Sequence, residues 1–140
     1  MGKFGKMLLC FLCAILLCGC KKAEPKPVTL VTRVQVQCRQ AGDTVLRSYT
    51  DPEKMDAVLL YLAGARPYGV ADRDPEQVIG RRISILLELS DGSTHTYRQW
   101  ADRYFSKNYA RWRLVDPEKA ARLYGLLQAL PSDDPLPPGE

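Results

Sequence analysis

The chain has almost no histidine and few cysteines from which a metal or catalytic centre could be built. Of its 140 residues one is histidine, His95, and four of the five cysteines lie within the first 20 residues, which leaves Cys38 as the only thiol beyond them. One thiol cannot form an internal disulfide, and one histidine without a Cys-X-X-Cys pair offers no ligand set for zinc or haem. We therefore expect no metal, no cofactor and a buried, structural role for Cys38.

Long hydrophobic runs and a strong net charge are also missing. The longest apolar run, Met7 to Leu17, has 11 residues and would form a helix about 16 Å long, whereas the bilayer core is about 30 Å thick. Lys3 and Lys6 account for two of the 20 basic residues, so the chain from Cys20 onward carries 18 against 16 acidic residues, a formal charge of +2. These values exclude a polytopic membrane protein and a strongly basic nucleic-acid binder, and nucleic acid is not an expected partner.

The first 19 residues have the layout of a secretory signal peptide. Two lysines precede the apolar run, and small residues follow it at Gly19-Cys20. The segment Leu17-Cys18-Gly19-Cys20 resembles the lipobox of bacterial lipoproteins, with Cys18 at a position where Ala or Ser is commoner. The resemblance covers about 22 residues and implies cleavage after Gly19, a diacylglycerol thioether on Sγ of Cys20, and a new α-amine that can take a fatty acid such as palmitate.

This resemblance implies a localisation for the protein. Two or three acyl chains give stable anchoring, so we expect a protein lipid-anchored on the extracytoplasmic face of the cell membrane, or in the outer membrane if the cell has one. Lys21 and Lys22 follow the anchor, where they either meet anionic headgroups or form a solvated junction.

Composition divides the rest of the chain into three parts. Residues 20–27 contain two prolines and several charges and are typical of an extended tether. Residues 131–140 contain four prolines, which predicts a disordered tail. The domain is therefore expected over 28–130, a length that can bury one hydrophobic core.

Hydrophobic periodicity predicts both strands and helices in this domain. Apolar and polar residues alternate over 30–39, 44–49, 82–90 and 93–100, with a type I′ hairpin turn at Asp91-Gly92 and a further hairpin around Lys107-Asn108. Asp-Pro-Glu-Lys begins two helical patterns, at 51–54 and 116–119; the repeat indicates either a duplicated half-domain or, as we favour, two uses of a good N-cap. The order ββα-ββ(ββ)α predicts an α+β fold, a small antiparallel sheet with two helices packed on one face.

Catalytic patterns are not convincing. Ser93 and His95 share one face of a strand, but the spacing identifies neither an orienting carboxylate nor an oxyanion hole. The acidic pairs near Asp51, Asp74 and Asp116 stand where charges favour helix starts. We predict that the protein is not an enzyme.

The stretch 97–113 differs from the rest of the chain because it holds six aromatic residues and five cations in 17 positions. Cations interleaved with rings can stack on sugars and grip anionic groups. The candidate binding residues are Arg98, Trp100, Arg103, Tyr104, Arg111 and Trp112. In the alternative interpretation the large rings are core and only the arginines face solvent.

Two functions follow from this stretch. The first is a non-catalytic protein-interaction module, and the second is the binding of an anionic envelope polymer or lipid through 97–113. Burial of the rings would remove the stacking platform that the polymer hypothesis needs. The sequence does not indicate an oligomeric state.

Overall fold

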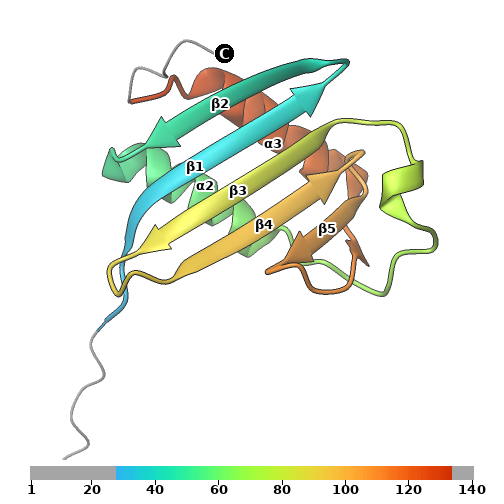
Figure 1. Cartoon of the computed structure of the whole chain (residues 1–140), viewed down its shortest axis with the longest axis horizontal. Coiled ribbons are helices and arrows are strands. Elements are labelled where there is room, and N and C mark those ends of the chain that lie inside the picture. The colour runs from blue at the N-terminus through green and yellow to red at the C-terminus, as the bar shows by residue number, and fades with distance from the viewer. Residues whose placement is uncertain (1–27, 134–140) are drawn as a thin grey trace, which may run out of the picture.

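The computed structural model describes residues 28–133, which form one antiparallel sheet with two helices on one face (Figure 1). The strands are β1 (Val31–Gln40), β2 (Asp43–Tyr49), β3 (Arg82–Leu89), β4 (Thr94–Trp100), β5 (Tyr104–Lys107) and β6 (Arg113–Leu114). The helices are α2 (Pro52–Gly64), α3 (Pro117–Ala129) and the 3₁₀-helix η1 (Pro75–Gln77). The sheet order is β2-β1-β3-β4-β5-β6, so the predicted α+β class and element order are confirmed.

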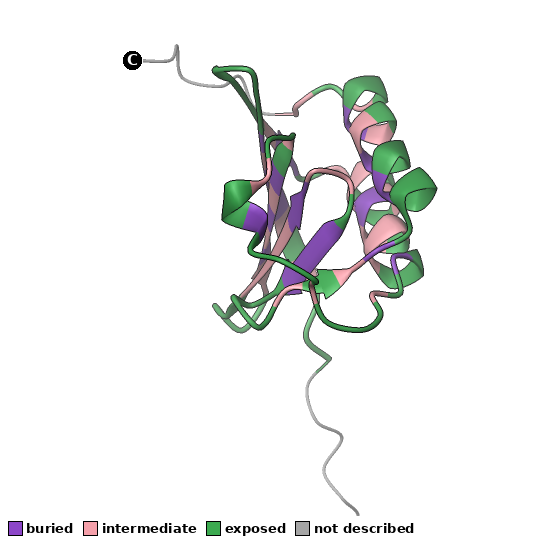
Figure 2. Cartoon of the chain, turned by 90° about the vertical axis from the view of Figure 1, so that its right-hand side faces the viewer, coloured by how far each residue is buried: buried purple, intermediate pink, exposed green. Residues whose placement is uncertain are grey.

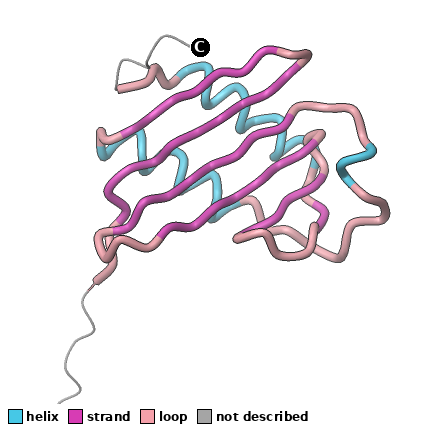
Figure 3. The backbone as a smooth tube through the Cα atoms, viewed as in Figure 1, coloured by secondary structure: helices cyan, strands magenta, loops and turns pink. Residues whose placement is uncertain are grey.

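The core lies between the sheet and the two helices (Figures 1 and 2). Val34, Val36 and Cys38 of β1 are buried, and each is paired with a buried apolar residue of β3 because the register matches the alternation of both strands. From the helices, α2 buries Val58, and α3 buries Ala120, Leu123 and Leu127. Figure 3 shows the helices crossing behind the strands, which leaves the opposite face of the sheet without a helical layer.

The repeated Asp-Pro-Glu segments act as N-caps. The carboxylates of Asp51, Asp74 and Asp116 each accept a hydrogen bond from the backbone N–H of the glutamate two residues later, and each precedes a proline at the start of its helix. The same device thus begins α2, η1 and α3. A third use, at η1, favours the capping explanation over a duplicated half-domain.

The hairpin at Asp91-Gly92 is present, but its turn type differs from the prediction. Type I′ needs positive φ at both central residues, and only Gly92 has it, at 83°. The Leu89 N–H bonds to the Ser93 carbonyl, which closes a three-residue loop with Gly92 in the left-handed region. Positive φ at two successive residues occurs instead at Ala41-Gly42, which joins β1 to β2.

The chain after α3 forms a strap along the outer edge of β2. The Ser48 N–H bonds to Oγ of Ser132, and the Asp133 N–H bonds to the Ser48 carbonyl. We predicted a disordered tail over 131–140, but the chain is ordered against β2 as far as Asp133; residues 134–140, like the predicted tether and signal peptide, lie outside the described residues.

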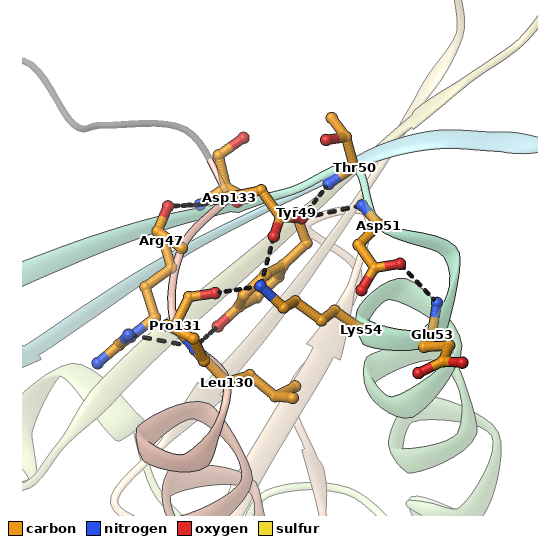
Figure 4. A network of polar contacts seen from close by, with 11 residues as sticks. Arg47, Tyr49, Thr50, Asp51, Glu53, Lys54, Leu130, Pro131 and Asp133 are labelled. Atoms are coloured by element: carbon orange, nitrogen blue, oxygen red, sulfur yellow. Dashed lines mark hydrogen bonds and ion pairs between the residues drawn. The ribbon is translucent and has the colours of Figure 1, made fainter.

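Asp133 connects this strap to the start of α2, as Figure 4 shows. Its Oδ2 accepts hydrogen bonds of 2.9 Å from the backbone N–H groups of Thr50 and Asp51, and its Oδ1 pairs with the Lys54 ammonium. The Lys54 hydrogen bond and these two backbone donors lower the pKa of Asp133 from its ordinary 3.8 to about 2. The carboxylate thus ties the end of the domain to β2 and α2.

We expect Asp133→Asn to lower the free energy of unfolding near neutral pH. Because the folded-state pKa is below the unfolded one, the stabilisation is fully present above pH 4 and disappears as the pH falls towards 2. Urea denaturation at pH 6, 4, 3 and 2 should show the gap between wild type and variant closing over this window. Asp56→Asn, an exposed site on α2, is the control, and a gap independent of pH would contradict the prediction.

Candidate functional site on the open face of the sheet

The sheet face opposite the helices, called the open face here, is polar and rich in arginine. In Figure 2 only η1 and its flanking loop project on that side of the sheet. Alternation and register place on it, from β1, β3 and β4, Arg33, Gln35, Gln37, Arg39, Arg82, Ser84, Leu86, Glu88, Thr94, Thr96, Arg98 and Trp100. Glu88 is the one acidic residue among these, and it accepts a hydrogen bond from Gln35 and lies 3.9 Å from Arg33.

Arginines and rings alternate at one end of the open face, in an arrangement that we call the arginine–aromatic ladder. Cζ of Arg82 lies 3.8 Å from the ring centroid of Trp100, and Trp100 meets Trp112 edge to face at 6.2 Å. Cζ of Arg98 lies 4.5 Å from the Trp112 ring and 4.6 Å from the Tyr109 ring. Cation–π contacts of this kind hold a guanidinium flat against its ring. Arg82 is exposed, whereas Nη2 of Arg98 already donates to Oγ of Ser106 at 3.3 Å and its Nε is buried.

Two tight turns bring the ladder together. Positive φ values at Ala101-Asp102 and at Asn108-Tyr109 reverse the chain after β4 and after β5, which returns the 109–112 segment towards β4. Gly80 packs against the first turn so closely that a Cβ there would lie 2.6 Å from Cβ of Ala101. Trp100 is fixed from the loop as well, because its Nε1–H donates to the Val78 carbonyl at 2.8 Å.

The rings of the stretch 97–113 are mostly packing groups. Trp100 is 8% exposed and Tyr104 1%, whereas Tyr109 is 70% exposed and Trp112 is intermediate. The ring of Trp100, one of the candidate binding residues, is covered by Arg82. An extended platform of exposed rings for sugars is therefore not formed by the described residues of this stretch.

The six predicted binding residues do not form one group. Arg98, Trp100 and Trp112 belong to the ladder, while Arg103 and Tyr104 contact Asp72 of the loop at 3.0 Å each. Chiefly the Tyr104 hydrogen bond, and then the Arg103 charge, hold the pKa of Asp72 below its ordinary value. Arg111 is exposed and has no described contact with the ladder.

Sequence reasoning missed two arginines that complete the site. Arg39 and Arg82 lie directly opposite each other on β1 and β3, and both are exposed. Like charges in this position repel, so a bound anion between them would be favoured. They line a shallow cavity of about 460 Å³ that also contains Asp43 and Glu76, although neither acid forms an ion pair with them among the described residues. The alternation of apolar and polar residues in β1 and β3 placed both arginines on a polar strand face. Only the pairing of the two strands showed that they are neighbours.

The residues considered for catalysis lie at the surface of a turn. The Ser93 hydroxyl donates to Asp91, and the ring nitrogen Nδ1 of His95 lies 3.0 Å from the Asn108 amide. Neither this cavity nor a second one beside β2 is lined by these residues. Cys38 is buried, and desolvation raises the pKa of its thiol, which makes it a poorer nucleophile.

We expect Trp100→Phe to destabilise the domain by at least about 1 kcal/mol, because the smaller ring fills less space and the hydrogen bond from the indole N–H to the Val78 carbonyl is lost. Urea denaturation followed by far-UV circular dichroism measures the change. Trp112→Phe is the matched control, since the Trp112 indole N–H has no described acceptor. Equal stabilities of the Trp100 and Trp112 variants would contradict the importance of this bond.

Comparison with known proteins gave no match: no protein-family model, no curated protein and no solved structure matches this chain. Within residues 28–133, no helix is long and apolar enough to cross a membrane. In the same range, no group of three or more His, Cys, Asp or Glu side chains is placed to hold a metal ion.

Proposed function

We propose that this protein is a lipid-anchored, extracytoplasmic interaction module whose open face binds an acidic surface of a partner protein. One observation carries the proposal. Arg82 and Arg98 are held against rings on a sheet face that no helix covers, Arg39 stands beside Arg82, and none of the three is in contact with a described carboxylate. The exposed Arg39 and Arg82 are placed to form charge-assisted hydrogen bonds with side-chain carboxylates, while Arg98, whose Nη2 donates to Ser106, adds positive charge beside them.

The surroundings of the ladder favour a protein over a polymer as the partner. The centre of the open face carries short amide and hydroxyl side chains, among them Gln35, Gln37 and Ser84, which can donate and accept hydrogen bonds across a flat contact. Arg, Trp and Tyr are the residue types enriched at protein interfaces. A sugar polymer would need exposed rings, and of the ladder rings only Tyr109 is largely exposed.

Anchoring would make a weak contact sufficient. The lipobox resemblance at residues 17–20 supports attachment through Cys20, a segment that lies outside the described residues. A module confined to the same membrane as its partner meets it at a raised effective concentration. An interaction module of this kind needs no catalytic group, which agrees with our prediction that the chain is not an enzyme.

The proposal is tested by crosslinking in the intact envelope. With a photoreactive amino acid at Gln37, we expect a discrete protein adduct that Arg39→Glu/Arg82→Glu reduces at least about tenfold, because two charge-assisted contacts become repulsive. Arg122→Glu, a charge reversal on the exposed surface of α3, is the control and leaves the adduct intact. An adduct unaffected by the open-face variant, or its absence from the wild type, would refute the proposal.

The polymer alternative has its own test. Binding of the full chain to purified anionic cell-wall polymer is measured at 50 and 300 mM salt, for the wild type and for the triple Arg98, Arg103 and Arg111→Ala variant. Affinity that neither salt nor the variant changes would sink this alternative, since an arginine-mediated contact weakens with both. A strong salt-dependent interaction lost in the variant would favour it over a protein partner.

Cys20→Ser tests the anchor. We expect the variant to accumulate as the uncleaved precursor without label from radioactive palmitate, because its side chain has no thiol to form the thioether. Gel mobility and membrane fractionation report both effects. The control Cys38→Ser keeps Cys20, and normal processing of the Cys20 variant would refute the lipoprotein assignment.

A further inference from the structure

The outer edge of β2 is an open strand edge. β2 lies at the end of the sheet, and its pairing with β1 runs without a break from Asp43 to Tyr49. The strap occupies Ser48, whose N–H and carbonyl both point outwards. Because outward groups alternate along a strand, the backbone groups of Thr44 and Leu46 point outwards too, and no described residue hydrogen-bonds them.

This edge has few of the features that protect strand edges from pairing. β2 contains no proline, lysine or bulge, and its only charged residues, Asp43 and Arg47, lie at either side of its middle. Apolar side chains stand on both of its faces, with Val45 46% exposed on the helix face and Leu46 44% exposed on the open face. The other end of the sheet is different, because the loop at Tyr68 hydrogen-bonds to Leu114 of the short strand β6.

We propose that a second copy of this chain pairs with β2 through a two-fold axis at Val45, which joins the two sheets into one. The sequence of β2 is self-complementary in this antiparallel register. Val45 lies opposite Val45 of the second copy, and Asp43 lies opposite Arg47 of the second copy, twice by symmetry. Thr44 and Leu46 of the second copy exchange two backbone hydrogen bonds, and the symmetric pair adds two more.

The strap and helix α3 leave room for this register and limit its length. With Val45 on the axis, Ser48 would lie opposite Gly42 of the second copy, which belongs to the β1–β2 turn, so pairing ends where the strap begins. On the helix face, α3 stands back from β2 and leaves a cavity of about 380 Å³ lined in part by Val45, Tyr124 and Leu127. The second copy's Val45 would cover the mouth of this cavity.

Other registers fit the edge less well. A two-fold axis at Leu46 would place Thr44 opposite Ser48, which the strap already occupies, and Arg47 opposite Val45. An axis at Thr44 would place Asp43 opposite Val45 and Arg47 opposite the turn residue Ala41, so both charge pairs would be lost. The charge pattern therefore selects the axis at Val45. The contact is small, so we expect a weak dimer in dilute solution.

Disulfide trapping tests the register in the full chain purified in mild detergent. Cys38 is the cross-strand neighbour of Val45, so the variants are built on Cys38→Ala to prevent a bridge within one chain. Val45→Cys should form a disulfide dimer on mild oxidation, since directly opposed, non-hydrogen-bonded residues have Cα atoms about 4.5 Å apart. Leu46→Cys, almost equally exposed, is the matched control, because the register leaves its two copies about 7–8 Å apart.

Each outcome of the trapping experiment decides the matter. A dimer with Val45→Cys at several times the yield of Leu46→Cys, above the Cys38→Ala background, supports the proposal. Equal yields indicate random collision, a higher yield with Leu46→Cys indicates another register, and the absence of a dimer indicates that a second copy does not pair with this edge. All of these would overturn it.

Charge reversal gives a second measurement that needs no cysteine. In sedimentation equilibrium, Asp43→Arg should dimerise about tenfold more weakly than the wild type, and mixing it with Arg47→Asp should restore the dimer as a heterodimer. A circular dichroism melt of each variant establishes that it is folded. A wild-type chain that stays monomeric up to millimolar concentration, or a mixture that does not recover, would refute the proposal. The open-face variants Arg39→Glu/Arg82→Glu leave β2 unchanged, so this test is independent of the proposed function.

Discussion

Burial of one face of the β1–β3 pair is the constraint on which the rest of the structure depends. Val34, Val36 and Cys38 can be kept from water only if helices cover that face, and α2 and α3 cover it. The two helices leave the other face of the sheet uncovered, and most of the intervening residues there are polar. Arg39 and Arg82 are therefore exposed neighbours because of the same alternation that builds the core.

The C-terminal half of the sheet places an aromatic cluster on the face that lacks helices. Trp100 would be a large exposed apolar ring there, and it is covered by Arg82, Trp112 and the loop that its indole N–H contacts. The same packing fixes the guanidinium groups, so stability and the candidate binding chemistry come from one set of contacts. A second polar network, buried between sheet and helices, joins Tyr61 to Gln99, whose amide donates to the Ala120 carbonyl at 2.9 Å. Burial is the main cause that raises the pKa of Tyr61, in keeping with a neutral hydroxyl there.

The strap after α3 determines where the ordered domain ends and how much of the outer edge of β2 is covered. Asp133 satisfies backbone donors at the start of α2, and Ser132 covers the end of β2 at Ser48. The prolines of residues 131–140 predicted disorder for the whole segment. Composition could not show that the Asp133 carboxylate accepts hydrogen bonds from three donors of residues 50–54. Before Ser48, the outward-facing backbone groups of β2 are not covered by the strap. The side chains of β2 therefore determine which strand can pair with this edge.

The sequence by itself determined the elements, the capping residues and the fold class, because alternation, helical stripes and Asp-Pro-Glu caps are local signals carried by consecutive residues. It also located an unusual stretch at 97–113, but it could not decide between surface and core. That decision required the pairing of β3 with β4 and the two turns that return Trp112 to Trp100, since ring burial depends on neighbours far apart in the chain. Only the tertiary structure added Arg39 and Arg82 to the site and separated Arg103 and Arg111 from it. The physical reason is that strand register decides which side chains meet. Register is set by hydrogen bonds between residues far apart in the chain, and local sequence patterns do not show it.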